Sequence, residues 1–124
     1  MKITDMLTAA ICLYHEARGE SKEGQIAVAH VILNRMAKSG ESVDAVVYKP
    51  FQFSWANRGA RPPIKDYIAL AACMQSVKDC LAERENGETM GGADHYFADY
   101  ITAPPWAAKM TKIAKIGKHS FYRG

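Results

Sequence analysis

The segment from residue 22 to residue 39 limits the fold of this chain more than any other. Its middle reads IAVAHVIL, which is apolar on nearly every side of a helix. A helix of that kind is buried on all sides. We expect it to start near Ser21, where Glu23 suits the positive end of the helix dipole, and to stop at Gly40. The sequence therefore predicts a central, buried helix.

Two further long helices are predicted, one before this segment and one after it. Both repeat apolar residues at positions i, i+3, i+4 and i+7, which is the spacing of one helix face. The first starts at Thr4 or Asp5, both plausible caps, and stops at Gly19. The other opens at Asp66 and ends at Gly87. Long helices therefore dominate the first two thirds of the chain.

Shorter elements fill the rest. SVDAVVY (42–48) is ambiguous between a helical turn and a strand. DHYFADY (94–100) predicts a strand, WAAKM (106–110) one helical turn, and TKIAKIGKHSFYRG (111–124) two strands around a Gly-Lys-His turn. The length of 124 residues suits one domain with its own core, so we expect a single domain over 1–124. Its class is α+β, mainly helical, with a small C-terminal β-ribbon.

A carboxylate stands where the first helix would be expected to carry an apolar side chain. An apolar face of that helix passes through Ala9 and Leu13, and the next position on this face is Glu16. Desolvation there would raise its pKa and let it act as a general acid, as in the cleavage of glycosidic bonds. Alternatively, Glu16 faces solvent at a frayed helix end, or pairs with Arg18 or Arg35. The pattern alone leaves both readings open.

A second carboxylate, Glu20, lies four residues further along. The two would share a face if the helix continued, but Gly19 argues against continuation. We expect Glu20 to stabilise the turn by accepting hydrogen bonds from backbone N–H groups.

Cysteine and histidine residues give no sign of a metal site. The three cysteines have no CxxC spacing and lie on apolar helical stripes, which favours buried free thiols. The four histidines form no HExxH pair. His30 fits a hydrogen-bonded core histidine, whereas His95 and His119 could meet in the ribbon region. We expect no metal and no other cofactor.

The net charge of +3 is mildly basic and suits an anionic partner. Apart from a lysine-rich stretch (109–118), the basic residues are scattered, whereas nucleic-acid binding normally needs a denser patch or a motif. The N-terminal segment, interrupted by Asp5, reads as a first helix and not as a secretion signal, and no apolar run could span a bilayer. We expect no nucleic-acid partner, no stable membrane insertion, and a monomer.

Aromatic and amide side chains are frequent in the predicted loops and strand ends. Sugar rings stack on aromatic side chains, and sugar hydroxyls bond to amides, so such residues could line a polysaccharide cleft. The alternative is an ordinary core, because most aromatics in a domain of this size are interior. We assign Gln52, Tyr96 and Trp106 to a cleft. We assign three phenylalanines to the core, namely Phe53, Phe97 and Phe121.

Several motifs together resemble the cell wall hydrolase family typified by the spore cortex-lytic enzyme SleB. They are YHEARGESKEGQIAVAHVILNR, VVYKPFQFS, DHYF, PPWAAKM and IGKHSFY, and they extend from about Leu7 to Tyr122. The resemblance implies a lysozyme-like, goose-type helical body. It also implies peptidoglycan glycan strands as the substrate, and cleavage between N-acetylmuramic acid and N-acetylglucosamine with formation of a 1,6-anhydro ring.

The family's catalytic acid is the first Glu of EARGE, which corresponds to Glu16 here. A lytic transglycosylase can work with this one carboxylate, because the C6 hydroxyl of the muramic acid replaces water as the nucleophile. By position, Gln52, Ser54 and Tyr96 are candidates to steady the oxocarbenium-like state. Glu20 would serve as a second carboxylate if the enzyme used water instead.

This sequence differs in two respects from the spore enzyme, which is exported and carries a further peptidoglycan-binding module. A short, mildly basic chain without either looks like a phage endolysin, held in the host cytoplasm until a holin lets it reach the cell wall or periplasm. The alternative is a bacterial wall-remodelling enzyme whose export signal has been removed. Competing activities are an N-acetylmuramidase, a zinc-dependent N-acetylmuramoyl-L-alanine amidase, and a non-catalytic glycan-binding module.

Overall fold

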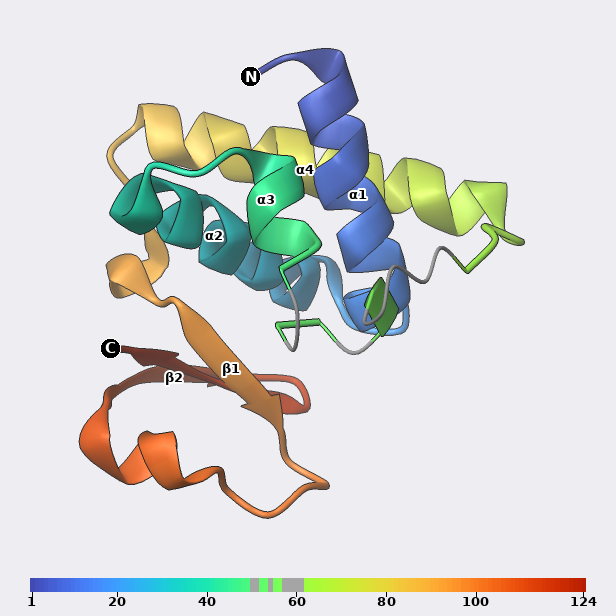
Figure 1. Cartoon of the computed structure of the whole chain (residues 1–124). Helices are drawn as coiled ribbons and strands as arrows, with labels where there is room; N and C mark the ends of the chain where they lie inside the picture. Colours follow the sequence, from blue (N-terminus) through green and yellow to red (C-terminus); the bar gives the residue numbers. More distant parts are fainter. Residues whose placement is uncertain (50–51, 54, 57–61) are drawn as a thin grey trace.

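The computed structural model describes residues 1–49, 52–53, 55–56 and 62–124. The described elements are α1 (Ile3–Ala17), α2 (Lys22–Ser39), α3 (Val43–Val47), α4 (Tyr67–Glu85), the 3₁₀ turn η2 (Met90–Gly92), β1 (His95–Ala98), the 3₁₀ turn η3 (Pro105–Lys109), β2 (Thr111–Ile116) and β3 (His119–Arg123). The helices form one body, and the strands form a small sheet beneath it (Figure 1). The predicted class, mainly helical α+β, is confirmed.

Helix α2 is the predicted central helix, and its long run of buried residues includes all of IAVAHVIL except Ile26. It packs against α1, α3 and α4. The Ser21 hydroxyl caps its start by accepting a hydrogen bond from the backbone N–H of Gly24, at 3.1 Å. Gly40 ends it in the left-handed conformation, with φ of 74°, which glycine adopts without strain. The boundaries predicted for this helix are confirmed.

The other helix predictions hold with one exception. Asp66 opens α4, since its carboxylate accepts a hydrogen bond from the Ala69 N–H at 2.9 Å. The ambiguous segment forms helix α3, capped by Ser42. The caps predicted for α1 are wrong, because this helix begins earlier, after Lys2, which makes no capping hydrogen bond through its side chain. A lysine side chain has no acceptor atom, so the sequence carries no cap at this position.

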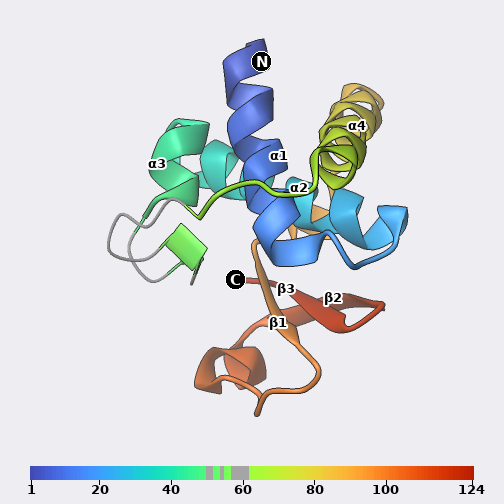
Figure 2. The same ribbon diagram turned by 90° about the vertical axis from the view of Figure 1, so that its right-hand side faces the viewer.

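The three strands that the structure describes form an antiparallel sheet in the order β1-β3-β2. Tyr96 pairs with Phe121, and both side chains point toward the helical body, where Phe121 is fully buried. His95 pairs with Tyr122 on the outer face, which η3 covers. Figure 2 shows the sheet lying across the C-terminal end of α1, so residues of β1 face the end of this helix.

The sheet register decides which of the predicted core residues are interior. Phe53 and Phe121 are buried, as expected. The prediction for Phe97 is wrong, because this side chain is half-buried on the outer face, stacked on Tyr122 with ring centroids 5.6 Å apart. His95 lies on that same outer face and His119 on the inner face, so the two do not meet. Strand alternation places them on opposite sides of the sheet.

His30 is the hydrogen-bonded core histidine that the sequence predicted. It lies in α2 and is 1% exposed. Its Nε2 atom is 2.9 Å from Oε1 of Glu83, and Nη1 of Arg84 faces its Nδ1 atom at 3.3 Å. Because a guanidinium only donates, Nδ1 accepts and Nε2 carries the hydrogen that Glu83 receives. The same Arg84 nitrogen donates to Asn34, so this network ties α2 to α4.

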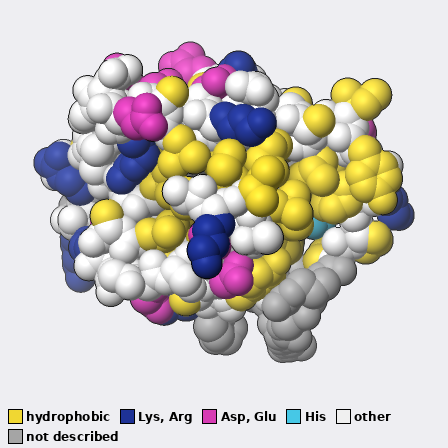
Figure 3. All heavy atoms as spheres, turned by 90° about the horizontal axis from the view of Figure 1, so that it is seen from above, with side chains coloured by type: hydrophobic (Ala, Val, Ile, Leu, Met, Phe, Trp, Pro, Cys, Tyr) yellow, Lys and Arg dark blue, Asp and Glu magenta, His cyan; other side chains and the backbone are white. Residues whose placement is uncertain are grey.

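Within the described residues, no helix combines the length and apolarity needed to cross a bilayer. Apolar side chains nevertheless gather on the face opposite the sheet, which carries the N-terminal end of α1 (Figure 3). Exposed apolar residues of α1 and of the start of α4 include Ile3, Leu7, Tyr67 and Ile68.

Candidate functional site

Glu16 lies in the last turn of α1, where the helix meets the inner face of the sheet. Its side chain is half-buried. One helical turn earlier, Cys12 and Leu13 are fully buried. Its Oε2 atom accepts a hydrogen bond from the Tyr96 hydroxyl at 2.9 Å. The structure therefore brings together two of the predicted site residues, one from the first helix and one from the first strand.

Burial raises the pKa of Glu16 above its ordinary value. The hydrogen bond from Tyr96 and the positive charge of Arg35 both lower the pKa, but they do not cancel the effect of burial. A carboxyl group in this setting keeps its proton to a higher pH than an exposed glutamate does, and it can act as a proton donor.

Tyr96 is held in place by the sheet. Its ring packs edge-on against His119, with centroids 5.0 Å apart, and lies 5.6 Å from the ring of Phe121. Burial raises the pKa of Tyr96 well above its ordinary value, and the negative charge of Glu16 adds to this rise. The phenol therefore stays neutral at physiological pH and remains a hydrogen-bond donor to Glu16.

Arg35 is a site residue that the sequence analysis named only as a possible partner of Glu16. Its Nε atom donates to the backbone carbonyl of Asp94 at 2.7 Å, and its guanidinium lies over the Phe53 ring, 5.2 Å from the centroid. Its Nη1 atom is buried and has no hydrogen-bond partner in the part of the chain that the structure describes. The available signal was an arginine two residues after the apolar run of α2 ends at Leu33.

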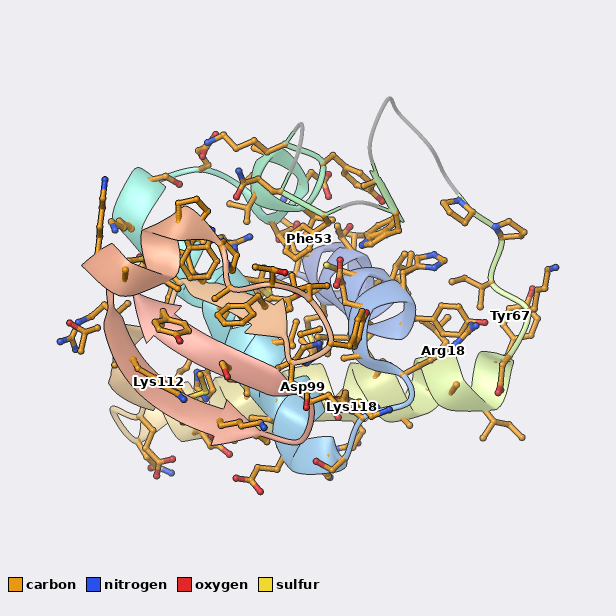
Figure 4. The ribbon with its side chains drawn as sticks, turned by 90° about the horizontal axis from the view of Figure 1, so that it is seen from below. Arg18, Phe53, Tyr67, Asp99, Lys112 and Lys118 are labelled. Atoms are coloured by element: carbon orange, nitrogen blue, oxygen red, sulfur yellow. The ribbon has the colours of Figure 1, made fainter. Side chains whose placement is uncertain are left out.

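Glu20 does not share the helix face of Glu16, because α1 has ended. Its Oε1 atom accepts a hydrogen bond from the Lys118 N–H at 3.1 Å and lies 3.4 Å from Nδ1 of His119. Seen from below, Lys118 and Asp99 lie next to each other at this end of the sheet (Figure 4), where the Asp99 N–H donates to the Lys118 carbonyl. Glu20 thus links the end of α1 to the β2–β3 turn, a turn remote in sequence.

This geometry predicts that Glu20→Gln lowers the free energy of unfolding by about 1 kcal/mol, because the hydrogen bond from Lys118 loses its charged acceptor. Urea unfolding at neutral pH measures the change. Glu88→Gln is the matched control, since Glu88 is exposed, and it should shift stability by less than about 0.5 kcal/mol. A Glu20→Gln protein with normal stability and no activity would mean that Glu20 acts in the chemistry instead.

Two of the other predicted site residues, Gln52 and Trp106, belong to the described part of the chain. Gln52 is exposed and lines a neighbouring pocket that also contains Arg35. Trp106 lies in η3 and packs against His95 and Tyr122 on the outer face, so the structure does not bring it to Glu16. Ser54 falls outside the described residues.

No group of three His, Cys, Asp or Glu side chains within the described ranges is arranged to hold a metal ion. The cysteines Cys12, Cys73 and Cys80 are buried free thiols. Burial raises the pKa of Cys73 to about 11 and that of Cys80 to about 12, and it raises the pKa of Cys12 as well. These thiols stay protonated at neutral pH, so they are poor nucleophiles.

The chain matches the family model described as Cell Wall Hydrolase over residues 19–122. The spore cortex-lytic enzyme of Halalkalibacterium halodurans is 33% identical over 120 residues, which cover 94% of this chain and 34% of that protein. The spore cortex-lytic enzyme of Bacillus subtilis is 31% identical over 120 residues, covering 94% of this chain and 37% of that protein. The chain thus spans about a third of the length of these relatives.

Two solved structures have a similar fold. The catalytic domain of the Bacillus cereus SleB protein superposes with a TM-score of 0.80 at 30% identity, covering 99% of this chain and 92% of that chain. The catalytic domain of the germination-specific lytic transglycosylase SleB from Bacillus anthracis gives a TM-score of 0.77 at 30% identity, covering 99% and 97%. The SleB-like fold that the motifs predicted is therefore confirmed. This chain is an enzyme of the cell wall hydrolase family, with the fold of the SleB catalytic domain.

Proposed function

We propose that this protein cleaves the bond between N-acetylmuramic acid and N-acetylglucosamine in peptidoglycan as a lytic transglycosylase, with Glu16 as both general acid and general base. The observation that carries the proposal is the half-buried carboxyl group of Glu16. Burial raises the pKa of this group, and its Oε2 atom accepts a hydrogen bond from Tyr96. The description of the Bacillus anthracis neighbour as a lytic transglycosylase supports this choice of reaction.

The reaction needs one proton donor that becomes a proton acceptor. Protonated Glu16 gives its proton to the glycosidic oxygen as the bond to the muramic C1 breaks. The resulting carboxylate then takes the proton of the C6 hydroxyl of the same muramic acid, and the C6 oxygen bonds to C1. The products are a 1,6-anhydro end and a free hydroxyl on the leaving sugar, and Glu16 regains its proton.

The neighbours of Glu16 suit both of its roles. Because the Tyr96 hydroxyl occupies Oε2, the other carboxyl oxygen, Oε1, is the one that exchanges the proton with the substrate. The positive charge of Arg35 stabilises the carboxylate that forms once the proton has left. Gln52 is proposed to contact the sugars near the cleaved bond.

Replacing Tyr96 by Phe should move the alkaline limb of the pH–activity profile to higher pH. The hydrogen bond from Tyr96 lowers the pKa of Glu16, so its loss raises that pKa further, and the acid stays protonated over a wider range. The maximal rate should fall about tenfold to a hundredfold, because the carboxyl group loses an orienting partner. An alkaline limb that stays in place, measured on soluble glycan strands, would contradict this role of Tyr96.

Digestion of purified peptidoglycan, followed by mass spectrometry of the fragments, tests the proposed reaction. Anhydro-muropeptides are expected, and treatment with a chelator should leave their yield unchanged. New reducing ends with added water would identify a muramidase, and free stem peptides an amidase. The absence of any fragments would identify a glycan-binding module, and each of these three results would refute the proposal.

The biological setting remains a prediction. We propose that the protein acts as a phage endolysin, held in the host cytoplasm until a holin gives it access to the wall. Expression in a bacterial host with and without a holin tests this: the culture should lyse only when both proteins are present.

A further inference from the structure

A pocket of about 200 Å³ shares one residue, Arg35, with the surroundings of Glu16. It lies between the C-terminal half of α2, helix α3 and the start of β1. Arg35 lines this pocket, and it is also the cation whose charge acts on Glu16. Arg35 thus connects this pocket to the surroundings of Glu16.

Among the described lysine and arginine side chains that line the pocket, Arg35 is the one that forms no direct ion pair with a carboxylate. Lys38 is paired with Oδ2 of Asp94 at 2.9 Å, and Lys49 with Oε1 of Glu41 at 3.1 Å. Arg35 donates to the backbone carbonyl of Asp94 and lies over the Phe53 ring, and among the described residues no carboxylate forms an ion pair with it. Three cations and two carboxylates line the pocket, and the charge of Glu16 also acts on Arg35. While Glu16 is protonated, the pocket therefore has an excess positive charge centred on Arg35.

An arginine without an ion-pair partner, as Arg35 is among the described residues, is suited to a carboxylate ligand. The guanidinium group matches the two oxygens of a carboxylate better than any other side chain does. The buried Nη1 atom of Arg35, which has no described partner, also shows that the protein itself does not saturate this group. The pocket is smaller than the sites that usually enclose a drug-sized molecule, so a short chain segment fits it better than a disaccharide.

We propose that this pocket binds a free carboxylate of the peptide stem carried by the muramic acid at the cleaved bond. The inference rests on the proposed function, because only a glycan strand held at Glu16 carries such a stem beside the pocket. The stem is a chain of amides that ends in a carboxylate. Gln52 can bond its amides, and Arg35 its carboxylate, with Lys38 and Lys49 adding longer-range attraction.

The test compares soluble glycan strands that carry peptide stems with strands from which an amidase has removed them. We expect the wild-type protein to show about a tenfold higher kcat/KM on strands with stems, which corresponds to about 1.4 kcal/mol. Lys49→Glu reverses a charge at the pocket rim on a side chain that is 51% exposed, so the fold should tolerate it. This variant should raise KM about tenfold for strands with stems and leave the kinetics on stripped strands unchanged.

Lys78→Glu is the matched control, because Lys78 is an exposed lysine of α4 that does not line the pocket, and it should behave as wild type on both substrates. A free stem tetrapeptide should inhibit the wild-type protein more strongly than the same peptide with amidated carboxylates. Equal kcat/KM on both kinds of strand, or equal inhibition by both peptides, would overturn the stem site while leaving the proposed reaction intact. Failure to cleave either strand would instead overturn the reaction itself.

Discussion

The Glu16→Gln variant should lose about a thousandfold or more of its glycan-cleaving rate while remaining folded. The amide keeps the size of the carboxyl group and can still accept the hydrogen bond from Tyr96, but its N–H protons are not acidic enough to be transferred to the glycosidic oxygen. General acid catalysis contributes about 10²–10⁴-fold, and here the same group also acts as the base. Anhydro-muropeptide release measures the effect, and near-normal release would refute the assignment of Glu16.

The same variant should be more stable than wild type at neutral pH. Burial raises the pKa of Glu16 in the folded protein, so ionisation of this side chain above that pKa opposes folding. Gln cannot ionise and avoids this cost. The gain should disappear below the ordinary value of 4.5, where Glu16 is protonated in both the folded and unfolded states. Thermal melting across pH checks the sign: a variant less stable at neutral pH would show that Glu16 is not desolvated.

The Phe121→Ala variant should lose about 3–5 kcal/mol of unfolding free energy. Phe121 is fully buried in β3, between the sheet and the helical body, and its ring lies 5.6 Å from Tyr96 and 6.2 Å from His119. Truncation opens a cavity under the strand that positions Tyr96. We therefore expect activity to fall as well, since the Tyr96 hydroxyl would no longer be held at Glu16.

Denaturant unfolding measures this loss, with Tyr100→Ala as the control. Tyr100 is 81% exposed, so its truncation should change stability by less than about 0.5 kcal/mol. A Phe121→Ala protein as stable as the control would show that the sheet contributes little to the fold.

The helices could be predicted because their causes are local. The apolar run of α2, the Ser21 cap and the left-handed Gly40 all lie within one segment of the sequence. Glu16 was found in the same way, since it interrupts an apolar face of α1. The start of α1 was missed because Lys2 carries no capping acceptor, whereas Thr4 and Asp5 do.

The partners of Glu16 could not be derived from local pattern. Tyr96 is 80 positions away in the sequence, and the residues of β1 are all half-buried, so their alternation does not reveal which side faces the helices. The same difficulty placed Phe97 in the core. Trp106 was assigned to the cleft because it is an aromatic residue of a predicted loop region, and only the fold shows that it packs on the outer face of the sheet. Glu20 was expected to stabilise a turn near its own helix, but it binds the remote β2–β3 turn, a pairing that only the tertiary fold creates.

The split of the Glu16–Tyr96 pair between a helix and a strand ties catalytic competence to the docking of the C-terminal ribbon. If the ribbon peels away while the helical body persists, the acid loses its orienting phenol and its shelter from water together. Moderate heating should then abolish glycan cleavage at a temperature where the helical circular dichroism signal is still that of the folded protein.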